Sequence, residues 1–345
     1  MATLLVCTTE AADPQVARYA AAAVAANLRP RIVLTPLEGT STRDAGLVHG
    51  VVAVQRAAAG LAAEAAEADG VRWHAAAAVR LTYQRLLLLG RLTAAGLPVP
   101  RYASVEARSG EGLDRVLTFR FPCRVTSPWP AADLRVADVD ALRELVSHRQ
   151  RDATILPPTD DTRLVVESVE PGPEFVLVGL LDDAALRVVS IVECDTTGQD
   201  SGVGTLVVSP SSLPRAMQAH LAGAVAQGCA AVGLGQGPVL SVCRRTGQGF
   251  SLVDLSPGTL GADLAPVLTL VTPDRHPCTL EDLVVRHAVG QSLDGYAHDG
   301  VYSGLRIGAR NDGAGGASPL LRTSATGSSV DEVKRRLSIQ PLSGT

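Results

Sequence analysis

Two glutamates flank a turn in the segment VVESVEPGPE at residues 165–174. Glu167 and Glu174 stand seven residues apart, with two prolines and a glycine between them. A carboxylate accepts hydrogen bonds from two hydroxyl donors, and a glycine allows the backbone to turn close to a ligand. Two interpretations follow. Either the pair lines a site for a hydroxylated ligand, or both belong to a solvated hairpin as ordinary surface carboxylates.

Two other segments place polar residues two positions apart. Arg124 and Thr126 alternate with apolar residues in FPCRVT, and Asp254 and Ser256 do so in FSLVDLS. Residues two apart on a strand point to the same face of a sheet, so each pair is expected to present its side chains together. A guanidinium can neutralise a phosphate, and oxygen ligands suit hard cations.

Composition narrows the class of protein. The 345 residues are 46% hydrophobic and carry a formal net charge of −4, which allows a sizeable core and two or three domains. The arginines are scattered with few aromatic residues between them, so a nucleic-acid surface is not expected. Neither the start of the chain nor the alanine-rich run at 20–26 has the pattern of a signal peptide or a membrane span.

The six cysteines are widely spread, with no C-x-x-C pair and no histidine at zinc-ligand spacing. This pattern favours buried, reduced thiols in a cytoplasmic protein over a disulfide framework or a zinc site. A nucleophilic Cys243 has no support beyond the presence of both cysteine and histidine in the chain.

The first 95 residues alternate predicted strands and helices, which indicates a parallel sheet with helices on its faces. Asp13 and Pro14 have the residue types of an N-cap and a first helical position. Strands are expected at 3–7, 31–37 and 46–54, and helices at 13–28, 57–68 and 75–95. No G-x-G-x-x-G motif follows the first strand, so a dinucleotide-binding enzyme loses its main support.

After about residue 116 the pattern changes to paired strands. Short strands around one helix predict a small α+β lid at about 116–163, and the last strand pair is joined by a turn at 246–249. Residues 311–345 are rich in glycine and serine and are predicted to form a flexible tail. Ser329 and Glu332 have capping-box spacing, so a short helix docked on the protein is the alternative to a frayed end.

Five segments follow the first domain in a definite order. They are RLTAAGLPVPRY, FRFPCRV, LVVESVEPGPEFVLV, and GLGQGPVLSV paired with FSLVDLSPGTLGADL. Over about residues 1–305 this order resembles the ATP-grasp superfamily, whose enzymes join a carboxylate to an amine or similar nucleophile through an acyl phosphate. The resemblance implies an α/β protein with an N-terminal doubly wound α/β domain at 1–95. An ATP-grasp domain at 96–310 would follow, with the α+β lid and a C-terminal antiparallel sheet.

The resemblance also implies roles for individual residues. Glu167 and the backbone of Val169 would contact the nucleotide base, and Glu174 would accept hydrogen bonds from the ribose. Arg85 would lie near the phosphates of ATP. Asp254 and Ser256 would stand at two positions that hold Mg²⁺, and a carboxylate and an amine would be the small-molecule substrates.

The same comparison shows departures from the family's pattern. Thr126 stands where the family has a phosphate-binding lysine, and Cys243 is aligned with a metal-binding glutamate. Arg124 is therefore expected to supply the catalytic positive charge, with Thr126 beside the nucleotide. Two hypotheses remain: an ATP-dependent carboxylate–amine ligase, or a degenerate relative that acts as a binding or scaffolding subunit. A homodimer or a partner protein is compatible with either.

Overall fold

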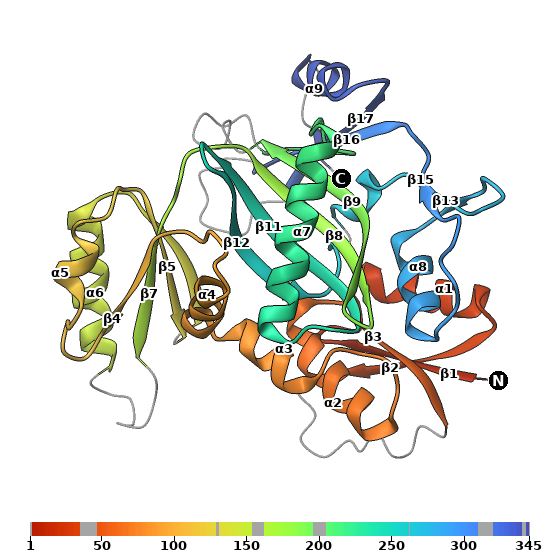
Figure 1. Cartoon of the computed structure of the whole chain (residues 1–345), viewed down its shortest axis with the longest axis horizontal. Helices are drawn as coiled ribbons and strands as arrows, with labels where there is room; N and C mark the ends of the chain where they lie inside the picture. The colour runs from red at the N-terminus through yellow and green to blue at the C-terminus, as the bar shows by residue number, and fades with distance from the viewer. Residues whose placement is uncertain are drawn as a thin grey trace.

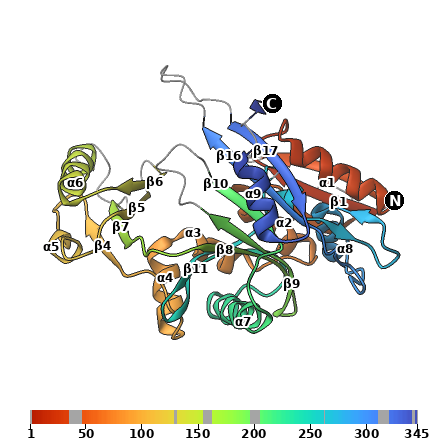
Figure 2. The same cartoon turned by 90° about the horizontal axis from the view of Figure 1, so that it is seen from above.

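The structure is a computed structural model, and it describes residues 2–34, 47–128, 131–153, 162–195, 205–261, 263–309, 320–339 and 343–344. Figure 1 shows three parts: an N-terminal α/β domain, a lid that stands to one side, and a large central sheet. Seen from above, the lid lies at one end of the molecule, and α7 and α1 lie on opposite sides of the large sheet (Figure 2).

A three-stranded parallel sheet forms the N-terminal domain, with β1 between β2 and β3. Its elements are β1 (Ala2–Thr8), α1 (Pro14–Ala25), β2 (Leu28–Leu34), β3 (Val48–Ala53), η2 (Arg56–Ala58) and α2 (Ala59–Asp69). Leu4 and Val6 pack with α1 and with α8 (Leu280–Ala288), whereas Leu5 and Cys7 pack with α2. Helices therefore cover both faces as predicted, although α8 comes from the far end of the chain.

The lid is a four-stranded antiparallel sheet of order β4-β7-β5-β6. Its elements are β4 (Tyr102–Glu106), α5 (Leu113–Val116), β5 (Cys123–Pro128), β6 (Ala131–Val136), α6 (Val139–Ala153) and β7 (Arg163–Ser168). Val125, Leu142 and Val166 share its core. The lid is longer than the predicted 116–163, because β4 pairs with β7 and the sheet therefore begins at Tyr102 and ends at Ser168.

The large sheet has eight strands in the order β12-β11-β8-β9-β10-β16-β17-β18. They are β8 (Glu174–Asp182), β9 (Ala185–Asp195), β10 (Thr205–Ser209), β11 (Gly237–Thr246), β12 (Gly249–Pro257), β16 (Tyr302–Ala309), β17 (Leu320–Gly327) and β18 (Ser343–Gly344). One face packs on the N-terminal domain, and α7 (Arg215–Val232) covers the other. The predicted turn at 246–249 joins β11 to β12, where Thr246 pairs with Gly249.

Short elements complete the chain after β12. They are η3 (Ala265–Val267), β13 (Leu270–Val271), β14 (Pro277–Cys278) and β15 (Ala297–His298), and the last three make a small sheet. None of the helices in the described part of the chain combines the length and the apolar character that a membrane crossing requires.

Two expectations about helices and the tail were wrong. The helix predicted at 75–95 is two helices, α3 (Ala76–Tyr83) and α4 (Arg85–Ala94), because Gln84 leaves the helical conformation. Residues 320–339 are not a flexible tail, since β17 pairs with β16 along its length. The helix α9 (Val330–Ile339) docks on the sheet through Val333 and Leu337, which bury against Val208. The glycine-rich part of the predicted tail, 310–319, lies outside the described residues.

Candidate functional site

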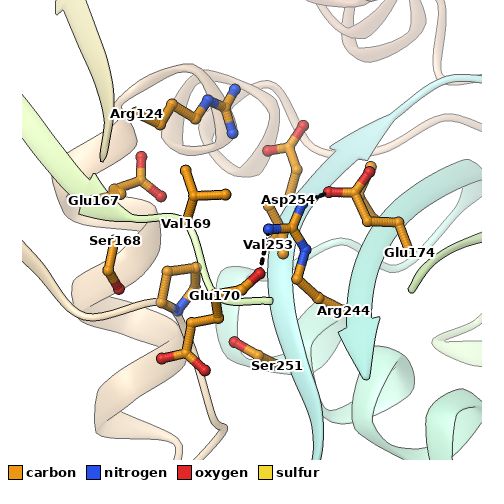
Figure 3. A pocket seen from close by; sticks show the side chains of 12 residues that line it. Arg124, Glu167, Ser168, Val169, Glu170, Glu174, Arg244, Ser251, Val253 and Asp254 are labelled. Carbon is orange, nitrogen blue, oxygen red and sulfur yellow. Dashed lines mark hydrogen bonds and ion pairs between the residues drawn. The ribbon is translucent and has the colours of Figure 1, made fainter. Parts of the chain in front are cut away.

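A cavity of about 300 Å³ lies between the lid and the large sheet. It is lined by Pro100, Arg124, Glu167, Ser168, Val169, Glu170, Glu174, Val242, Arg244, Ser251, Val253 and Asp254. Figure 3 shows that the lid supplies Arg124 and Glu167 from one side, and β11 and β12 supply Arg244 and Asp254 from the other. The segment predicted to bind a ligand, 165–174, therefore does border a cavity.

Strand alternation places the lid residues of the cavity. Val125 and Val166 point into the lid core, so their neighbours Arg124 and Glu167 face the opposite side, where they are cross-strand partners. Thr126 is on the same face of β5 but is not among the residues that line the cavity. Its hydroxyl oxygen is buried and has no hydrogen-bond partner among the described residues.

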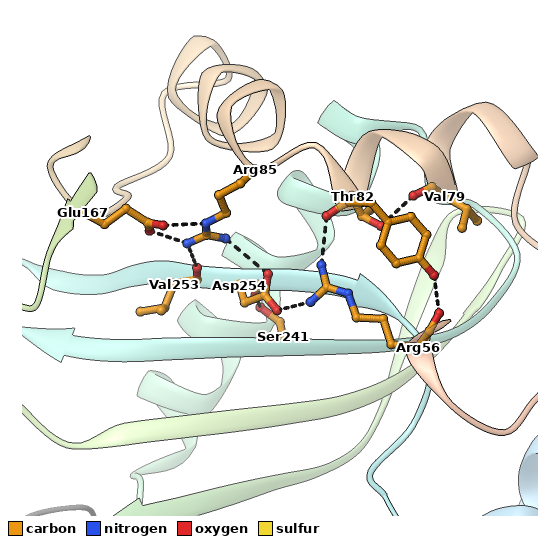
Figure 4. Close-up of polar contacts among 9 residues, drawn as sticks. Arg56, Val79, Thr82, Arg85, Glu167, Ser241, Val253 and Asp254 are labelled. Atoms are coloured by element: carbon orange, nitrogen blue, oxygen red, sulfur yellow. Dashed lines mark hydrogen bonds and ion pairs between the residues drawn. The ribbon is translucent and has the colours of Figure 1, made fainter. Parts of the chain in front are cut away.

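Two of the carboxylates that line the cavity, those of Glu167 and Asp254, belong to a chain of four alternating charges, which Figure 4 shows. Arg85 donates to Glu167 through both Nε, at 2.7 Å from Oε1, and Nη2, and its Nη1 lies 3.2 Å from Oδ1 of Asp254. The other oxygen of Asp254, Oδ2, accepts from Nη1 of Arg56 at 2.6 Å. The side chains of Arg85 and Glu167 are only 8% and 2% exposed. Arg85 is thus held between two carboxylates in this conformation.

Arg56 reaches this chain of charges from the N-terminal domain. Its Nη2 donates to the carbonyl of Thr82 at 2.9 Å, and its guanidinium lies 5.6 Å from the ring centre of Tyr83. The Tyr83 hydroxyl donates to the carbonyl of Arg56, and burial raises the pKa of Tyr83, so this hydroxyl stays a donor at neutral pH. These contacts fix Arg56 against Asp254.

The second glutamate of the segment is also paired with an arginine. Glu174 on β8 is the cross-strand neighbour of Arg244 on β11, whose Nη2 donates to Oε1 of Glu174. Nη1 of the same arginine donates to the carbonyl of Glu170 at 2.6 Å. Only one oxygen of Glu174 is bonded in this way, so the other can still accept a hydrogen bond from a ligand.

The loop between the two glutamates is held by backbone contacts. The N–H of Val169 donates to the carbonyl of Pro122 at 3.2 Å, so it is not available to a ligand in this conformation. Gly172 has φ +138°, and a Cβ there would lie 2.1 Å from the carbonyl oxygen of Arg245. Gly172 therefore permits close packing of the loop on β11, a different reason from the predicted approach to a ligand.

The residues at the expected metal position do not fit Mg²⁺. Both oxygens of Asp254 accept hydrogen bonds from guanidinium groups, which would repel a divalent cation. Ser256 is 4% exposed and does not line the cavity. In the part of the chain that the structure describes, no group of three or more His, Cys, Asp or Glu side chains could hold a metal ion.

Cys243, which was aligned with a metal-binding glutamate, does not face the cavity. Cys243 is fully buried on the α7 side of the large sheet, and burial raises the pKa of its thiol to about 12. The neighbours of Cys243 on β11, Val242 and Arg244, line the cavity instead, and Val242 pairs with Asp254 across the strands. An apolar side chain therefore stands where the cavity could have held a second carboxylate.

Sequence reasoning did not identify Arg56, Arg244 or Val242. Arg56 lies 198 residues from its partner Asp254, so no local spacing connects them. Arg244 and Val242 could have been found, because counting back from the turn at 246–249 places both on the same face of β11.

Comparison with known proteins identifies the fold. No protein-family model matches the chain, and no curated protein matches its sequence. Many solved structures do match most of it, among them the following three. An L-amino acid ligase from Bacillus licheniformis has 16% identity, covers 98% of this chain and 97% of its own, and superposes with a TM-score of 0.74.

A carboxyaminoimidazole ribonucleotide synthase from Aspergillus clavatus, complexed with ATP, has 13% identity, 99% and 97% coverage and a TM-score of 0.71. A RimK domain protein, described as ATP-grasp, from Sphaerobacter thermophilus has 16% identity, 84% and 100% coverage and a TM-score of 0.60. This chain has the ATP-grasp fold. The predicted fold class is confirmed, and at these identities the likeness concerns the fold alone.

Proposed function

We propose that the protein binds a nucleotide-like ligand between its lid and its large sheet, and that it serves as a binding or scaffolding subunit without metal-assisted ligation. One observation carries the proposal: Asp254, the only carboxylate at the expected metal position, is bonded to both Arg85 and Arg56. A fold alone does not determine activity, whereas these contacts occupy both oxygens of the carboxylate.

The cavity itself supports ligand binding. Its volume of about 300 Å³ is at the small end of sites for small molecules. Ser168, Arg244 and Ser251 line it, and each also has a buried polar atom with no hydrogen-bond partner among the described residues. Buried polar atoms are seldom left without a partner, and a bound polar ligand would supply one.

The test measures binding and turnover separately. Binding of adenosine and of its 5′-phosphates is titrated by calorimetry, and ADP release is measured with mixtures of amino acids and other small carboxylates and amines. We expect binding without substrate-dependent ADP release. Ser251→Ala should weaken binding, whereas the exposed Ser338→Ala on α9 should not. ADP release that requires both a carboxylate and an amine would contradict the proposal.

A second candidate is the ATP-dependent carboxylate–amine ligase that forms an acyl phosphate. The position of Arg124 favours it, because this guanidinium borders the same cavity as Glu174 and Asp254. A cation aimed at developing phosphate charge can contribute ~2–4 kcal/mol of transition-state stabilisation. Under this candidate, ADP release is detected, and Arg124→Ala lowers it by ~30-fold to 1000-fold.

A further inference from the structure

The charges around the cavity balance without any metal ion. Four carboxylates border it, those of Glu167, Glu170, Glu174 and Asp254. Four guanidiniums stand within or against the same lining: those of Arg124, Arg244, Arg85 and Arg56. Three of the four carboxylates have arginine partners. The net charge of the side chains around the cavity is therefore close to zero.

A triphosphate brings about four negative charges into such a site. Without a divalent cation, these charges would enter a partly closed cavity whose arginines are already matched by carboxylates, so the lining has no excess positive charge to compensate them. Metal binding would first have to displace Arg85 or Arg56 from Asp254. Displacing Arg85 would leave its buried guanidinium with one carboxylate partner fewer, which is unfavourable.

Three residues that line the cavity have a buried polar atom without a hydrogen-bond partner among the described residues: Oγ of Ser168, Oγ of Ser251 and Nε of Arg244. Turned toward the cavity, the two hydroxyls could bond the neutral acceptors or hydroxyls of an uncharged ligand. Val169, Val242 and other apolar side chains supply the remaining surface. This mixture matches a flat, hydrogen-bonding group with an attached polyol.

We infer that the cavity binds a nucleoside or nucleoside monophosphate, without a divalent cation, in preference to a nucleoside triphosphate. The inference rests on the proposed function and specifies the ligand class of the same site. It requires no covalent step. The arrangement that would exclude a metal ion, two arginines on Asp254, is also what keeps the cavity neutral.

The experiment titrates the full-length chain with adenosine, AMP, ADP and ATP, each once with EDTA and once with Mg²⁺. The expected result is that adenosine and AMP bind with Kd values that agree within twofold in the two buffers, and that ATP binds at least tenfold more weakly than AMP. Ser251→Ala should weaken adenosine binding ~3-fold to 10-fold through the lost hydrogen bond, and Ser338→Ala is the matched control.

The two ideas fail in different ways. ATP that binds tenfold more tightly than AMP, or only with Mg²⁺, overturns the inference about ligand class but leaves nucleotide binding in place. No binding by any of the four compounds, in either buffer, overturns both. An unchanged adenosine affinity in Ser251→Ala, with the protein folded by circular dichroism, removes the assignment of the free hydroxyl to this ligand.

Discussion

At the scale of single residues, three of the four carboxylates that line the cavity are bonded to arginines. Arg85, Arg56 and Arg244 bind the acidic side chains that would otherwise attract a cation. A buried ion pair gains little over an apolar pair of the same size, because both charges lose their water. The contribution of these arginines is therefore best measured by breaking one pair at a time.

Replacing Arg85 should leave Glu167 as an unpaired buried charge. We expect Arg85→Met to lower the free energy of unfolding by ~3–5 kcal/mol, measured by urea denaturation. The double variant Arg85→Met with Glu167→Gln should recover most of this loss, because it removes the stranded carboxylate. A double variant as unstable as the single one would show that the ion pair itself is not the source of the effect.

Two adjacent residues of β11 face opposite sides of the sheet and should respond differently to the same substitution. Cys243→Glu places a charge in the fully buried core under α7 and should cost ~3 kcal/mol or more. Val242→Glu faces the cavity, where water can reach the carboxylate, and should cost clearly less. The comparison is made by urea denaturation of both variants, and the reverse order of stability would contradict the assigned faces.

At the scale of the elements, the sequence predicted the features that depend only on residues close together in the chain. The Asp13 cap with Pro14, the alternation around Arg124, and the hairpin after Thr246 were predicted and are present. The break at Gln84 was missed, because both of its flanks have good helix formers and tertiary contacts decide where the chain bends.

The site was harder to predict than the elements. Glu167 and Glu174 were singled out, but their arginine partners are 82 and 70 residues away in the sequence. Such pairs depend on how three parts of the chain meet, and no sequence spacing records this. The buried position of Cys243 was missed for a similar reason, since a strand's face is fixed by its neighbours as well as by its own alternation.

The docked helix α9 offers a test at this scale. Leu337 is fully buried against the large sheet, whereas Arg335 on the same helix is exposed. We expect Leu337→Ala to lower the free energy of unfolding by ~2–4 kcal/mol and Arg335→Ala to change it by less than about 0.5 kcal/mol. Equal effects of the two substitutions would indicate that α9 is frayed in solution, as the sequence first suggested.

At the scale of the whole molecule, a few buried polar contacts join parts that are distant in the sequence. Arg56, Arg85, Glu167 and Asp254 connect the N-terminal domain, α4, the lid and the large sheet. His74 makes a second connection, from the N-terminal domain to the start of β11. Acid should weaken the second connection by protonating the imidazole.

His74 should make the stability of the whole protein fall on mild acidification. The imidazole is 1% exposed, its Nε2–H donates to the carbonyl of Pro238 at 2.8 Å, and its Nδ1 accepts from the N–H of Gln236 at 3.4 Å. A second proton would place an Nδ1–H against that N–H. Burial, and to a lesser extent the nearby His287, lowers the pKa of His74 from 6.5 to about 4, although the bond to Pro238 opposes the shift.

The sign of the effect follows from which state binds the proton. Between pH 6.5 and about pH 4 the unfolded chain protonates this histidine and the folded chain does not, so the free energy of unfolding falls as the pH is lowered. This loss of unfolding free energy is absent above about pH 7 and reaches about 3 kcal/mol near pH 4. Urea denaturation at a series of pH values measures it.

His74→Gln should have a shallower fall over this range than the wild type, and the exposed-site variant His220→Gln should have the wild-type slope. Because His74→Gln can be less stable at every pH, the slope and not the absolute stability is the test, and parallel curves for wild type and His74→Gln would show that this contact does not govern the acid response.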